Sequence, residues 1–90
     1  MPKYIIERDL SGAGKIPKEE LKAIAQRANK IAAEMDNRVT WLESFITDDR
    51  LYCVYIAPDA ESIREHATKG KFPCTRVSEV RGIIDKTTAE

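Results

Sequence analysis

The chain has 90 residues, and its 15 lysines and arginines balance 15 aspartates and glutamates, so the formal net charge is zero. With no basic excess and no run of about eighteen apolar residues, it is expected to bind neither nucleic acid nor membrane. The length predicts one domain, residues 1–90, with a thin core that docking against a second copy would complete. Two cysteines without Cys-x-x-Cys spacing and an N-terminus without an apolar signal region predict a cytosolic protein with free thiols.

The first half of the chain predicts a strand followed by a long helix. Residues 4–8 are strand formers, and the turn-rich residues 9–14 end that strand. Pro17 suits the first turn of a helix, where the two following glutamates favour the positive end of the helix dipole. Apolar residues then recur at steps of three and four until Asp36, and they form one stripe. The stripe consists of Leu21, Ile24, Ala25, Ala28, Ile31, Ala32 and Met35.

The second half predicts a hairpin, a shorter helix and a last strand. Residues 39–46 and 51–56 read as strands joined by a tight polar turn. Asp59 is a good N-cap for a helix that runs to Lys69 and stops at Gly70. Residues 78–84 form the last predicted strand, and a polar tail follows. This order predicts a ferredoxin-like α+β fold, βαββαβ, with a four-stranded antiparallel sheet and two helices on one face.

The opposite face of this sheet would be bare, and strand alternation predicts which side chains lie there. A face rich in aromatic side chains is unfavourable in water. We therefore expect a homodimer that pairs through this face, in which two sheets enclose a cavity. The predicted bare-face residues are Glu7, Trp41, Glu43, Phe45, Cys53, Tyr55, Arg81 and Ile83.

Several side chains are candidates for chemistry in or near that cavity, and each has two interpretations. Glu7 and Glu43 suit either a metal or proton-transfer pair, or ion pairs with an arginine such as Arg81. Cys53 is a structural thiol or a ligand, and the only histidine, His66, either binds a metal or bonds to nearby backbone. The predicted cavity lining is Glu7, Trp41, Glu43, Tyr55 and Arg81, and the predicted metal donors are Glu7, Glu43, Cys53 and His66.

Residues 52–59, 64–67, 72–73 and 84–85, with Glu7-Arg8-Asp9 and Trp41, resemble a family of short bacterial proteins of unknown function. Its members are often described as nickel-binding proteins. The resemblance covers nearly the whole chain and implies a ferredoxin-like, dimeric α/β barrel that holds nickel or another divalent transition metal. Some relatives have a histidine in the Trp-x-x-Ser segment, where this chain has Glu43. The missing imidazole predicts weaker nickel binding.

Three functions follow from this sequence. The first is a homodimeric binding protein with a metal or small ligand between its sheets. The second is a small enzyme, similar to the monooxygenases or isomerases that share this fold, which rests on analogy of fold alone. The third is an interaction module with an inert interface. No motif assigns a catalytic residue.

Overall fold

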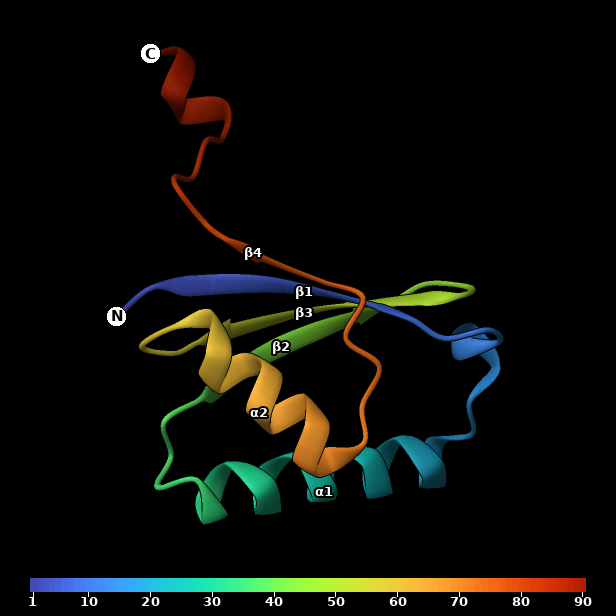
Figure 1. Ribbon diagram of the computed structural model, residues 1–90. Coiled ribbons are helices and arrows are strands. Elements are labelled where there is room, and N and C mark those ends of the chain that lie inside the picture. Colours follow the sequence, from blue (N-terminus) through green and yellow to red (C-terminus); the bar gives the residue numbers. More distant parts are fainter.

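The computed structural model describes all 90 residues, and it contains one antiparallel sheet with the strand order β2-β3-β1-β4. Both helices cover the same face of this sheet (Figure 1). The predicted ferredoxin-like α+β arrangement is therefore confirmed. The elements are β1 (Lys3–Asp9), η1 (Ala13–Lys15), α1 (Lys18–Glu34), β2 (Thr40–Ile46), β3 (Arg50–Ile56), α2 (Ala60–Gly70), β4 (Arg76–Glu79) and η2 (Lys86–Ala89).

Local chemistry explains where the helices begin and end. The carboxylate of Asp59 accepts a hydrogen bond from the Ser62 backbone N–H at 2.8 Å, which caps α2. The last residue of α2 is Gly70, and a side chain there would overlap the ring of Phe72. Beyond α1, Asp36 and Asn37 both take the left-handed conformation, so the helix cannot continue.

The core lies between the helices and the sheet. Alternate residues of β1, namely Tyr4, Ile6 and Arg8, are buried on the helix-covered face. They pair with residues of β3 that lie on the same face, so Tyr55 lies opposite Tyr4 and Cys53 opposite Ile6. The buried hydrophobic cluster comprises Tyr4, Ile6, Met35, Val39, Cys53, Tyr55, Ala57 and Ile63.

A bulge in β2 overturns part of the predicted bare face. Trp41 pairs with Tyr55, but Glu43 pairs with Val54, so Leu42 is one extra residue in the strand. The extra residue shifts the alternation: Trp41 lies on the helix-covered face, whereas Glu43 and Phe45 lie on the open face. The prediction was correct for Glu43, Phe45 and Glu7, but wrong for Trp41.

The placement of Cys53 and Tyr55 on the bare face was also wrong. Both are buried under the helices, and the open-face residues of β3 are Tyr52, Val54 and Ile56. Both residue sets of this strand are apolar, so its alternation alone does not distinguish the covered face. Cys53 and Tyr55 lie on the helix-covered face because they pair with Ile6 and Tyr4, the buried residues of β1.

The last strand ends earlier than predicted, at Glu79 rather than at residue 84. Beyond β4, the Val80 N–H still donates to the carbonyl of Lys3, the first residue of β1, at 2.8 Å. Arg81 and Ile83 therefore lie outside the sheet and are exposed, so their predicted place on the bare face was wrong. The residues after β4 run away from the domain and end in η2 (Figure 1).

Candidate functional site

Neither helix covers the open sheet face, which is apolar at its centre. Two rows of side chains cross it in register. Partly buried apolar side chains occupy the middle, and Phe45 on the edge strand is 55% exposed. One row is Arg76, Glu7, Tyr52 and Phe45, and the other is Ser78, Ile5, Val54 and Glu43.

The two predicted carboxylates share this open face but do not meet within one chain. Glu7 lies on β1 and Glu43 on β2, with β3 between them, so two strand spacings of about 4.8 Å separate them. The Glu7 carboxylate pairs with Arg50 at 3.2 Å, and Arg50 also pairs with Asp9 at 2.7 Å. Arg50 therefore provides the counter-charge that the sequence suggested for Arg81. Arg81 instead pairs with Glu79 at 3.3 Å, away from the open face.

His66 is buried on the other side of the sheet, between α2 and α1. Only 1% of the residue is exposed, and its Nε2 lies 2.9 Å from the Ala28 carbonyl oxygen. A carbonyl oxygen only accepts, so Nε2 carries the proton and donates. Burial lowers the pKa of His66 from its usual 6.5, and the hydrogen bond to Ala28 partly opposes this. In this structure His66 therefore fits the interpretation of a histidine that hydrogen-bonds to nearby backbone.

The four predicted metal donors are not brought together in one chain. Cys53 and His66 are buried on the helix-covered face, whereas Glu7 and Glu43 lie on the open face. No group of three or more histidine, cysteine, aspartate or glutamate side chains is arranged to hold a metal ion. Nickel favours imidazole among its ligands, and the only imidazole is buried on the opposite side of the sheet from Glu7 and Glu43. The four predicted donors therefore do not converge on one site within a single chain.

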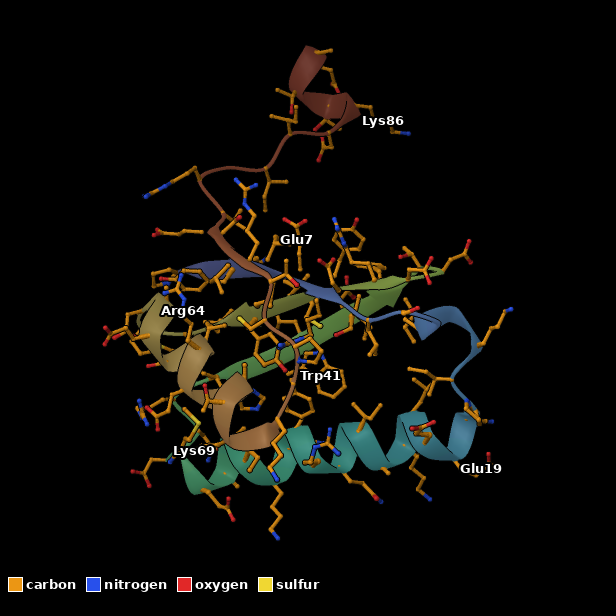
Figure 2. The ribbon with its side chains drawn as sticks, turned by 45° about the vertical axis from the view of Figure 1, so that its right-hand side comes forward. Glu7, Glu19, Trp41, Arg64, Lys69 and Lys86 are labelled. Carbon is orange, nitrogen blue, oxygen red and sulfur yellow. The ribbon has the colours of Figure 1, made fainter.

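A cavity of about 1190 Å³ separates the N-terminal part of α1 from the sheet. We call this space the helix-side cavity. Its lining includes Trp41, Tyr55 and Ser44, so two of the predicted cavity residues line a space on the opposite side of the sheet from the one expected. The Trp41 Nε1 donates to the Ser44 hydroxyl at 2.9 Å, and its ring stacks on Tyr55 with centroids 6.5 Å apart. Figure 2 shows Trp41 between the sheet and α1, with Glu7 on the far side.

Arg8 lies in the wall of this cavity and was missed as a site residue. It is 5% exposed, its Nε donates to the Cys53 sulfur at 3.3 Å, and its Nη1 donates to the Pro73 carbonyl at 2.6 Å. The guanidinium carbon lies 6.0 Å from the ring centroid of Tyr55, and burial raises the pKa of Tyr55 to about 12. The alternation Tyr4-Ile6-Arg8 was the signal in the sequence, because it places Arg8 on the buried face.

A four-stranded antiparallel sheet with two helices on one face, and an uncovered opposite face, defines a small ferredoxin-like α+β protein. The chain belongs to the nickel responsive protein SCO4226-like family, whose sequence model matches residues 4–80. This confirms the resemblance inferred from the sequence. No curated protein matches the chain.

The crystal structure of SCO4226 from Streptomyces coelicolor A3(2) has the same fold. It matches with a TM-score of 0.74 at 18% identity, over 91% of this chain and 99% of that one. At this identity the likeness establishes the fold. None of the helices in our structure combines the length and the apolar character that crossing a membrane requires.

Proposed function

We propose that the chain is a small homodimeric binding protein, paired through its open sheet face, that holds a divalent transition metal between the two sheets. The observation that carries this proposal is the apolar centre of the open face, formed by Ile5, Val54 and Ile56 and flanked by Tyr52 and Phe45. The name of the family, nickel responsive, supports the metal.

Pairing two such faces is favourable because it removes apolar side chains from water. Full burial of one large apolar side chain contributes about 1.5–3 kcal/mol, and each copy offers several. Phe45 is 55% exposed in the single chain and has the most surface to lose. Packed sheets lie about 10 Å apart, which leaves room for side chains from both faces to meet.

The donors on this face are carboxylates, which limits the metal chemistry. One chain supplies Glu7 and Glu43 at separate places, and a second copy related by a two-fold axis would supply both again. At a given set of ligands, nickel generally binds with higher affinity than manganese. We therefore expect nickel to bind more tightly than manganese, but less tightly than at a site with imidazole ligands.

The molar mass in solution tests the pairing. Light scattering on the wild-type chain should give twice 10.2 kDa. Phe45→Asp should give the monomer mass with an unchanged circular dichroism spectrum. Ile46→Asp is the matched control, because Ile46 is the next residue, is 44% exposed and pairs with Leu51 on the helix-covered face. A monomeric wild-type protein would refute the proposal, and loss of the dimer in both variants would place the contact at the β2 edge.

Calorimetric titration of nickel chloride into the untagged protein tests the metal. Glu7→Gln and Glu43→Gln should weaken binding while the fold remains, and Cys74→Ser should not change it, since Cys74 is an exposed thiol in the segment after α2. Unchanged nickel affinity in both glutamine variants would show that the carboxylates are not the ligands.

A further inference from the structure

The helix-side cavity contains a buried positive charge without a negative partner. None of the ion pairs of the chain includes Arg8. Its two hydrogen-bond acceptors, the Cys53 sulfur and the Pro73 carbonyl, are a weak acceptor and a neutral group. Neither compensates a full positive charge, and a buried charge is costly unless it is paired. The guanidinium carbon also lies 6.0 Å from the ring centroid of Tyr55 and 5.6 Å from that of Phe72, so aromatic rings rather than a carboxylate flank the charge.

The rest of the lining is apolar in the interior and cationic at the rim. Trp41, Tyr55 and Phe72 contribute aromatic surface, and partly buried apolar residues of α1 face them across the space. The charged residues that line the cavity are Arg8, Lys18, Lys22, Arg27, Lys71, Glu19 and Glu20, five basic and two acidic. This excess of positive charge attracts anions to the opening.

We propose that the helix-side cavity binds a small organic carboxylate with an apolar body, and that the carboxylate pairs with the guanidinium of Arg8. A guanidinium presents its donors in a planar fork that matches a carboxylate. The apolar body would lie between Trp41 and α1. Ligand cavities commonly measure about 300–1,000 Å³, so a cavity of 1190 Å³ with an opening has room for such a molecule.

This site is separate from the one under Proposed function. It lies on the helix-covered face and uses residues of one chain, whereas the proposed metal and dimer contacts lie on the open face. The oligomeric state of the protein therefore does not enter the test. A result against carboxylate binding would not affect the proposed dimer. A monomeric protein would likewise not affect the proposed carboxylate site.

Trp41 is the only tryptophan and lines the cavity, so its fluorescence reports on this site. We would titrate the full-length chain with phenylbutanoate and, separately, with the neutral phenylbutanamide, which has a similar apolar body. The carboxylate should change the fluorescence saturably and bind about tenfold or more tightly than the amide, because a charged hydrogen-bonded pair is worth that factor. Equal affinities, or no binding of either compound, would overturn the proposal.

Arg8→Met removes the charge and keeps an unbranched side chain. This variant should bind the carboxylate about tenfold or more weakly and the amide unchanged. Arg64→Met is the control, since Arg64 is an exposed arginine of α2 that does not line the cavity; it should bind nearly as the wild type does. An equal loss in both variants would mean that general charge attracts the ligand. If Arg8→Met does not fold, the comparison of acid and amide on the wild-type chain decides.

Discussion

The Nε2 of His66 donates a hydrogen bond to the Ala28 carbonyl at 2.9 Å, and this bond joins α2 to α1. The ring also lies 5.4 Å from Tyr55 and 5.6 Å from Phe72 between centroids. The histidine thus connects the two helices to the layer of aromatic rings beneath them. Its protonation state matters for the fold because the surroundings favour the neutral ring.

We predict that His66 makes the protein less stable as the pH falls below 6.5. Burial lowers the folded-state pKa below the usual 6.5, and the nearby charge of Arg8 acts in the same direction. The unfolded chain therefore takes up the proton first. The contribution is complete above about pH 6.5 and is lost as the pH falls from there through the folded-state pKa, with a slope of at most about 1.4 kcal/mol per unit.

Urea unfolding of the wild type and of His66→Gln, measured between about pH 7.5 and pH 5, tests this. Glutamine can still donate to Ala28 but does not titrate. The free energy of unfolding should fall less steeply with decreasing pH in the variant. Equal slopes would contradict the prediction.

We predict that Gly70→Ala destabilises the domain although alanine favours helices. The new methyl group would overlap the Phe72 ring. That ring has little room to move, because it stacks on His66 and the guanidinium carbon of Arg27 lies 4.8 Å from the centroid of the Phe72 ring. Forcing an extra methyl group into such a contact costs about 1–3 kcal/mol. Thermal unfolding should show the loss, and Gly82→Ala, with open space around it, should not. Adding Phe72→Leu to Gly70→Ala should relieve the overlap; a further loss of stability would argue against it.

We predict that Asp59→Ala lowers the melting temperature by about 4 °C or more through loss of the α2 cap. Hydrogen bonds from Ser62 lower the pKa of Asp59 below 3.8, so its contribution is present above pH 3.8 and is lost as the pH falls through the folded-state value. The matched control is Asp85→Ala, because Asp85 accepts the same kind of bond from the Thr87 N–H but caps only η2. A similar fall in melting temperature in both variants would show that capping of α2 is not the cause.

The sequence predicted the order of elements well, because each signal was local. Asp59 does cap α2, and the apolar stripe of α1 spans the structured helix. The faces of the sheet were harder to predict, since they depend on the bulge at Leu42 and on which strands pair. A single misplaced residue exchanges the two faces, which is why Trp41 was assigned to the wrong one.

The candidate sites depended even more on tertiary contacts. Glu7 and Glu43 were correctly placed on the open face, but the partner of Glu7 is Arg50, which the sequence had placed in the hairpin turn. The alternation of β1 could have shown that Arg8 is buried, but only the structure shows that no carboxylate forms an ion pair with it. Spacing in the sequence carries no information about such an absence.

The bulge at Leu42 has a consequence for how this protein can evolve. In a regular strand residues three apart point to opposite faces, yet Trp41 and Ser44 share a face and a hydrogen bond, while Glu43 and Phe45 between and beyond them point the other way. Seven residues of β2 thus divide into two sets that touch different surroundings. Selection can alter one set while the other stays fixed, whereas a one-residue insertion or deletion in β2 would change both at once.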